Sequence, residues 1–230
     1  MVNYGGTPHV VVGFQDDYKV LFYSEHDACL SVPITIAAGY GNLKMGTAMA
    51  KNLSNLKTGN KDKLVPYNPT TFTGTEEHPG RAYLVSDGTT LLSYVYVTLA
   101  DSYKFKVGDD LIINDDTTTA ENLGAITAID RSTYPHMAKI TFTTAIGGTT
   151  FTTARFACVF VEAGTSGNNY SDCVGILMRS IATGTGENAQ GGNAQIVIKN
   201  AVLYDGMCTN FDAAAKTDLS AATFGEFVYF

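Results

Sequence analysis

The sequence predicts a mainly β protein, because short runs of alternating apolar and polar residues recur between turn-forming pairs. Residues 138–143 place Ala138, Ile140 and Phe142 on one face of a strand and polar side chains on the other. Turn-forming pairs separate such runs: Asp87-Gly88, Gly108-Asp109, Gly147-Gly148 and Asp205-Gly206. Only residues 210–216 have a helical pattern, with Asn210 as the expected N-cap ahead of a run of alanines.

Two further runs extend the β pattern. Residues 195–199 place Ile196 and Ile198 on the same face of a strand. Residues 156–161 are apolar on both faces. Such a run is typical of a strand covered on both sides, so it should be a central strand or lie at a subunit contact.

The chain divides into an outer domain and an insertion. Six strand-like runs follow one another within residues 80–163, and polar, turn-rich stretches flank this block. Alternating strands over this length suffice for a small closed β-barrel or sandwich. Because apolar strand-like runs also lie on both sides, residues 37–79 and 164–230 are expected to form one discontinuous β domain.

Composition narrows the class of partner. Charged residues make up 16% of the 230 residues, against roughly 25% in an ordinary soluble domain. The net charge of −7 argues against nucleic acid as the main partner. One stretch is locally basic, with Lys44, Lys51, Lys57, Lys61 and Lys63 around Asp62. It is either a solvated loop or a contact for an acidic protein surface.

No targeting sequence or membrane-spanning run is evident, so we expect synthesis in a cytoplasm and no membrane partner. Cys29, Cys158, Cys173 and Cys208 show no metal-ligand spacing. Free thiols are therefore expected, rather than a zinc site or a disulfide framework.

Residues 37–52 contain closely spaced glycines, a lysine and a threonine, and thus invite comparison with a phosphate-binding loop. Gly41 and Gly46 have the P-loop separation, but Thr47 occupies the position of the required lysine. A dinucleotide-binding fingerprint also fails, because Lys44 stands where its third glycine belongs. Since β-prone runs flank the stretch, Gly39, Gly41 and Gly46 are predicted to form turns between strands.

The outer segments resemble the head decoration proteins of tailed bacteriophages, the family of the phage lambda capsid decoration protein. The resemblance rests on a glycine-rich turn and a strand at Lys63-Leu-Val-Pro-Tyr67, followed by a strand at Gly175-Ile-Leu177. It continues through a strand over 195–202, an Ala-rich helical turn over 212–218 and a last apolar strand over 224–230. Parts of the insert also resemble small β modules of phage virion proteins.

The resemblance implies a structural protein of the virion, made in the bacterial cytoplasm. Members form homotrimers at three-fold or quasi-three-fold positions of the expanded capsid, where they bind the major capsid protein and stabilise the shell. The alternative is an adhesion or glycan-binding module in which the insert recognises a host-surface glycan.

No catalytic residues, cofactor or metal ligands are predicted. The histidines, at 9, 26, 78 and 136, are not spaced as metal ligands, and the Ser24–Asp27 cluster would split between two faces of a strand. Asp109, Asp110, Asp115 and Asp116 flank a short apolar strand and are read as solvated turn acids rather than a calcium site. We therefore expect a binding protein and not an enzyme.

Residues 1–36 are predicted to be an N-terminal capsid-binding arm. Its β-prone runs could pair with the edge of a capsid-protein sheet, which would make Val10, Val12, Leu21 and Tyr23 contact residues. Lys44 and Lys51, just beyond the glycine turn, are the further candidate contacts with the shell, where they would face an acidic surface.

Overall fold

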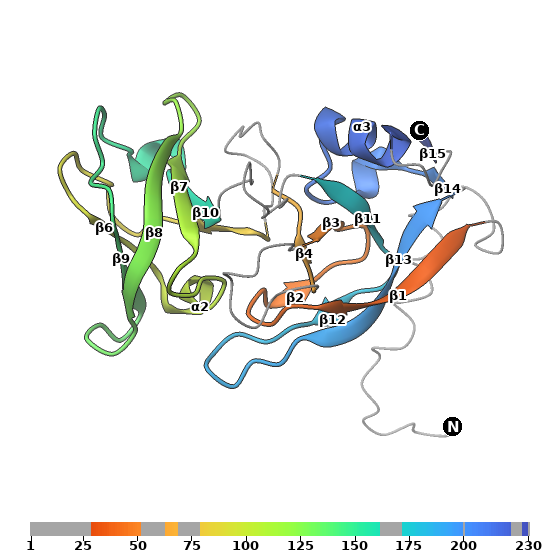
Figure 1. Cartoon of the computed structure of the whole chain (residues 1–230), viewed down its shortest axis with the longest axis horizontal. Coiled ribbons are helices and arrows are strands. Elements are labelled where there is room, and N and C mark those ends of the chain that lie inside the picture. Colours follow the sequence, from red (N-terminus) through yellow and green to blue (C-terminus); the bar gives the residue numbers. More distant parts are fainter. Residues whose placement is uncertain are drawn as a thin grey trace, which may run out of the picture.

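The computed structural model describes residues 29–51, 63–68, 79–161, 172–199, 201–221 and 227–229, and it confirms a mainly β chain (Figure 1). The described strands form two larger assemblies, a closed barrel and a curled sheet. Two strand pairs accompany them: β2 (Asn42–Leu43) with β12 (Ile181–Ala182), and β14 (Ala201–Leu203) with β15 (Phe227–Tyr229). The described ranges also contain two 3-10 turns, at Thr153–Arg155 and Asp205–Met207.

The closed barrel has the strand order β1-β13-β11-β3-β4. Its strands are β1 (Leu30–Ile36), β3 (Ala48–Lys51), β4 (Leu64–Pro66), β11 (Cys173–Leu177) and β13 (Gly192–Lys199). All neighbours are antiparallel except β4 and β1, whose parallel pairing of Leu64 with Ile36 closes the ring. Met49, Val65, Ile176 and Val197 are fully buried around it.

The predicted arm is wrong in its C-terminal boundary. Leu30–Ile36 is a barrel strand that pairs with β13 along its length. Its apolar residues alternate with the exposed Pro33 and Thr35, a pattern that indicates a strand without saying which strand it pairs with. An arm can therefore extend only to about residue 29, and residues 1–28 lie outside the described part of the chain.

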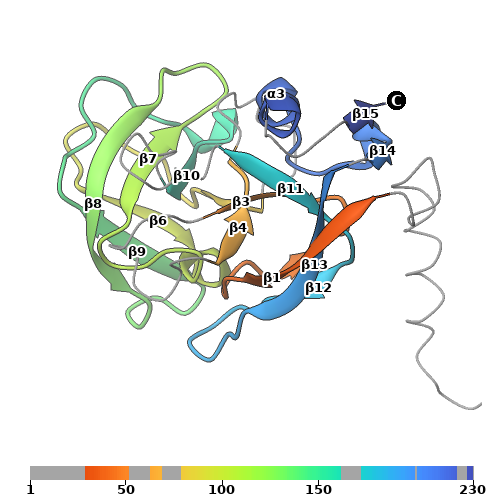
Figure 2. The same ribbon diagram turned by 45° about the vertical axis from the view of Figure 1, so that its right-hand side comes forward.

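The insert contributes a six-stranded sheet in the order β5-β10-β7-β8-β9-β6. Its strands are β5 (Arg81–Tyr83), β6 (Tyr94–Thr98), β7 (Asp110–Asn114), β8 (Glu121–Asp130), β9 (Met137–Phe142) and β10 (Cys158–Val161). An isolated bridge between Leu84 and Val97 brings the two edges of the sheet together, so the sheet curls on itself. In the described chain the closed barrel thus belongs to the outer segments, and the insert is this curled sheet (Figures 1 and 2).

Strand alternation in the insert follows the sequence pattern. Ala138, Ile140 and Phe142 of β9 are buried, as predicted. β10 lies between β5 and β7, and each of its residues is buried, which confirms a central strand over 158–161. The predicted run began two residues too early, because Phe156 is exposed and has a left-handed φ of 55°. The outer face of β10 is covered within the chain itself, where Arg81 stacks on the Phe160 ring at 4.4 Å.

The main helix, α3 (Ala213–Ala221), starts later than predicted. Asn210 has a left-handed φ of 64°, which a helix N-cap does not adopt. Asp212 is the cap instead, because its Oδ1 accepts a hydrogen bond from the Ala215 N–H at 2.8 Å. A short helix, α2 (Leu99–Ser102), was not predicted; Thr98 caps it by accepting from the Asp101 N–H at 3.0 Å.

Candidate functional site: a cavity at one end of the barrel

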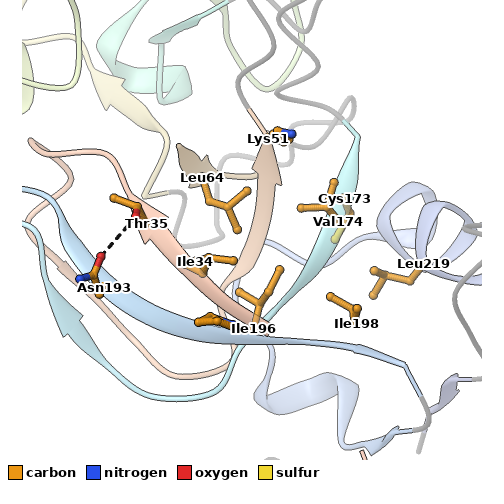
Figure 3. Close-up of a pocket in the computed structure, with 11 residues that line it drawn as sticks. Ile34, Thr35, Lys51, Leu64, Cys173, Val174, Asn193, Ile196, Ile198 and Leu219 are labelled. Atoms are coloured by element: carbon orange, nitrogen blue, oxygen red, sulfur yellow. Dashed lines mark hydrogen bonds between the residues drawn. The ribbon is translucent and has the colours of Figure 1, made fainter. Parts of the chain in front are cut away.

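A cavity of about 660 Å³ opens at the end of the barrel where β3 ends and β4 and β11 begin (Figure 3). We call it the mouth cavity. It brings together residues from six elements that are far apart in the sequence: Pro33, Ile34, Thr35, Lys51, Leu64, Cys173, Val174, Asn193, Ile196, Ile198 and Leu219.

The lining of the mouth cavity is largely aliphatic. Ile34, Leu64 and Ile196 lie around its middle, whereas Ile198 lies beside Leu219 of α3 (Figure 3). On one border, Thr35 donates a hydrogen bond from Oγ1 to Asn193 Oδ1 at 3.2 Å, which ties β1 to β13. An apolar cavity of this size suits a bulky apolar side chain or a short apolar segment.

A lysine and an acid lie near the same border of the mouth cavity, because Cys173 pairs with Ala50, the neighbour of Lys51. Lys51 is the cation of the described lining, at the end of β3, and Lys63 directly precedes the lining residue Leu64. On the α3 side, Asp218 Oδ2 accepts a hydrogen bond from the Cys173 N–H at 2.9 Å. Burial raises the pKa of Asp218; the Cys173 hydrogen bond opposes this shift, and the neighbouring Asp172 and Asp212 add to it.

The structure does not bring the two predicted lysine contacts together. Lys44 follows β2, before the turn that leads into β3, and Lys51 ends β3. Strand β3 alone separates these two ends by about 10 Å. Lys51 therefore belongs to the mouth cavity, while the exposed Lys44 belongs to the opposite end of the barrel.

The predicted turn glycines all adopt left-handed backbone conformations, with φ of 100° at Gly39, 67° at Gly41 and 84° at Gly46. The Gly39 and Gly41 N–H groups donate to the carbonyls of Thr183 and Gly184. Strands β2 and β3 follow this stretch, and not the helix that a phosphate-binding loop requires. The turn therefore connects strands of the same domain and does not join a docked arm to the body.

A second cavity, of about 400 Å³, lies between the glycine turn and the insert, near Tyr103, Val107 and Glu187. Arg131 at its border is engaged by its own chain: Nε donates to Ser102 Oγ at 2.9 Å and Nη2 to the Ser102 carbonyl at 2.8 Å. Its guanidinium also lies 4.5 Å from the centre of the Tyr103 ring. These contacts hold the end of α2 in place, which is a structural task.

The acids flanking β7 differ partly from expectation. Asp109 and Asp115 are buried rather than solvated. Asp109 Oδ2 accepts from the Lys106 N–H, while Asp115 accepts from the Thr117 and Thr118 N–H groups and lies 3.2 Å from Arg155 Nη2. Burial favours a higher pKa for Asp115, but these hydrogen bonds outweigh it and lower the pKa. Both carboxylates organise turns.

Of the remaining predicted groups that the structure describes, Cys173 lines the mouth cavity. Within the described ranges, no cluster of histidine, cysteine and acidic side chains has the arrangement of a metal site. The four cysteines are free thiols, as predicted. Val10, Val12, Leu21 and Tyr23, together with His9, His26 and His78, lie outside the described residues.

Sequence reasoning missed most of the mouth-cavity lining. Ile34, Leu64, Val174 and Leu219 come from β1, β4, β11 and α3, and no local spacing connects them. The available signal was the run at 195–199, because the alternation there places the lining residues Ile196 and Ile198 on one face without saying what that face meets.

No helix among the described residues meets the length and hydropathy needed to cross a bilayer. Comparison of the chain with protein-family models, with curated proteins and with solved structures finds no match.

Proposed function

We propose that this chain is a capsid decoration protein, which binds the outer surface of an expanded phage shell and stabilises it without catalysing a reaction. One observation carries the proposal. The segments that resemble the decoration family, on both sides of the insert, assemble into one unit: the closed barrel with α3 and β14 beside it. A resemblance scattered over the sequence thus corresponds to a single folded body.

The mouth cavity is the attachment site in this proposal. Its aliphatic lining would take an apolar side chain of the major capsid protein, and Lys51 at its border would pair with an acidic residue beside that side chain. Residues 1–28, with the predicted contacts Val10, Val12, Leu21 and Tyr23, would add strand pairing to the shell.

Shell binding by matched charge reversals tests the attachment site. Expanded, undecorated capsids are sedimented with the wild-type protein, Lys51→Glu or Lys44→Glu. We expect Lys51→Glu to weaken binding roughly 10-fold or more, because it would place two acidic side chains side by side, and Lys44→Glu to bind like wild type. Equal effects of the two reversals would contradict the mouth cavity as the contact, and absence of wild-type binding would contradict the function.

The N-terminal contribution is tested separately, by deleting residues 1–28, which leaves β1 intact. We expect a folded barrel by circular dichroism and weaker binding to capsids. Undiminished binding of the truncated protein would contradict a contribution of residues 1–28 to capsid binding.

Homotrimer formation remains part of the proposal, but strand β10 does not supply its interface. The apolar surface of residues 158–161 is buried within the chain and leaves nothing for a subunit contact. The low charge content still favours a packed surface. Analytical ultracentrifugation should give a trimer mass on the capsid-free protein at micromolar concentration, and a persistent monomer would argue against a preformed trimer.

A further inference from the structure

The insert carries a cluster of tyrosines on its outer face. Tyr94 and Tyr96 belong to β6, and Tyr134 lies between β8 and β9. Because Val95 and Val97 are buried in the core, strand alternation turns Tyr94 and Tyr96 outward. In Figure 1, β6 and β9 lie at the left, on the far side of the insert from the barrel. We call this surface the tyrosine face.

The three rings orient one another. Tyr94 and Tyr96 are edge-to-face with centroids 5.6 Å apart, and Tyr96 and Tyr134 are edge-to-face at 5.4 Å. The hydroxyls of Tyr96 and Tyr134 lie within hydrogen-bond distance, at 3.3 Å. Lys139 places its Nζ 4.0 Å from the centre of the Tyr94 ring. These half-buried rings are therefore held in place before any ligand binds, which lowers the entropic cost of binding.

Small hydroxyl side chains surround the tyrosines. Thr141 lies opposite Tyr94 in the β6–β9 register, and the exposed Thr127 donates from Oγ1 to the Thr141 carbonyl. Thr98 is exposed at the end of β6. An interface for another protein would be expected to add aliphatic side chains at its centre, whereas threonines flank the tyrosines here and the apolar Met137 lies at the end of the row, opposite Thr98.

The charges of the tyrosine face balance. Lys139 is opposite Tyr96 on one side and Asp130 on the other. The Asp130 carboxylate is engaged by its own loop, accepting from the Ser132 N–H at 2.9 Å and the Thr133 N–H at 3.1 Å. One cation and one acid in the same row give a surface without net charge, which complements a neutral ligand.

We propose that the tyrosine face binds a neutral oligosaccharide. The apolar C–H side of a pyranose ring would stack on the tyrosine rings, and its hydroxyls would exchange hydrogen bonds with the hydroxyls of Tyr96 and Tyr134. The proposal does not depend on capsid attachment, since the tyrosine face and the mouth cavity lie in different units of the chain.

The test uses the full chain and a panel of neutral oligosaccharides: maltohexaose, laminarihexaose, chitohexaose and cellohexaose. Binding is followed by calorimetry and by tyrosine emission, which no tryptophan obscures because the chain has none. Two double variants change the strand tyrosines: Tyr94→Ala with Tyr96→Ala removes both rings, and Tyr94→Phe with Tyr96→Phe keeps them. A single variant, Tyr134→Ala, leaves the strands unchanged. Met207→Ala, an exposed apolar change outside the insert, is the control.

We expect at least one panel member to bind, with a roughly 10-fold loss of affinity on removing the two rings. The Phe pair should retain most of the affinity, Tyr134→Ala should lose part of it, and Met207→Ala should match wild type. If the Ala pair does not fold, Tyr134→Ala decides alone. The proposal is overturned if no panel member binds at about 10 mM, if binding survives all ring removals, or if only charged glycans bind.

Discussion

At the level of single residues, Gly39 shows how closely the barrel and the insert fit. Its φ of 100° favours glycine, and a Cβ added there would come 2.3 Å from the carbonyl oxygen of Tyr103 in the insert. A backbone atom cannot move aside as a flexible side chain can. Gly39 is therefore required both for the turn and for the contact between the two units.

Gly39→Ala should destabilise the protein more than Gly186→Ala. Gly186 has a φ of 124° but open space around its Cβ position, so alanine there costs only backbone strain, about 1–2 kcal/mol. Gly39→Ala adds the clash and should cost roughly 3 kcal/mol or more. Urea unfolding of both variants measures the difference, and equal costs would show that the contact with Tyr103 relaxes freely.

Several carboxylates should make the stability depend on pH. Hydrogen bonds lower the pKa of Asp87 and Asp130, and hydrogen bonds that outweigh burial lower that of Asp115. A folded-state pKa below the unfolded value gives stability that is present above about pH 4 and is lost as the pH falls through the folded-state pKa. We therefore expect the urea midpoint to fall steadily between about pH 4 and pH 2.

The contribution of Asp218 to the stability should change with pH in the opposite direction. Its pKa is raised in the folded state, so its contribution favours folding at low pH and is lost as the pH rises from the unfolded to the folded-state pKa. In the Asp218→Asn variant, the amide oxygen can still accept the hydrogen bond from the Cys173 N–H, but the side chain cannot ionise. The variant should be more stable than wild type at pH 7 and similar to it at pH 3, and lower stability at pH 7 would contradict this account.

At the level of elements, α3 depends on a single carboxylate. Asp212 Oδ1 accepts from the Ala215 N–H and from the hydroxyl of Tyr67, which donates at 2.9 Å. Burial raises the pKa of Tyr67, and the hydrogen bond with Asp212 contributes further. Asp212 therefore caps the helix and at the same time joins it to the end of β4.

Asp212→Ala should cost about 2–3 kcal/mol, because it removes the cap and leaves the buried Tyr67 hydroxyl without this acceptor. Tyr67→Phe keeps the cap and should cost about 1 kcal/mol. The double variant should cost less than the sum of the two, since both singles remove the same hydrogen bond. Strict additivity in thermal or urea unfolding would show that the two groups act independently.

At the level of the whole molecule, the two units have separate strand pairing. The described strands of the insert pair only with one another, and the barrel closes without them. The units meet at the turn around Gly39 and at the region of Tyr103. This arrangement makes the insert removable in principle.

Deleting residues 80–163 and joining Pro79 to Gly164 with a short Gly/Ser linker should leave a folded barrel. We expect lower stability, because the deletion uncovers the buried Gly39, whose turn packs against Tyr103, but retained capsid binding and complete loss of oligosaccharide binding. Circular dichroism and capsid sedimentation provide the measurements. An insoluble product would show that the barrel needs the insert in order to fold.

The sequence by itself determined the β class and the inward face of strands such as β9, because these follow from local alternation and turn chemistry. It also identified the turn glycines. The tertiary structure decided what depends on distant partners: Leu30–Ile36 became a barrel strand because β13 and β4 pair with it, and Asp212 became the cap because Asn210 turns to left-handed φ. The mouth cavity likewise forms only when β1, β4, β11 and α3 pack together. The residue spacing within one segment carries no information about contacts with another segment.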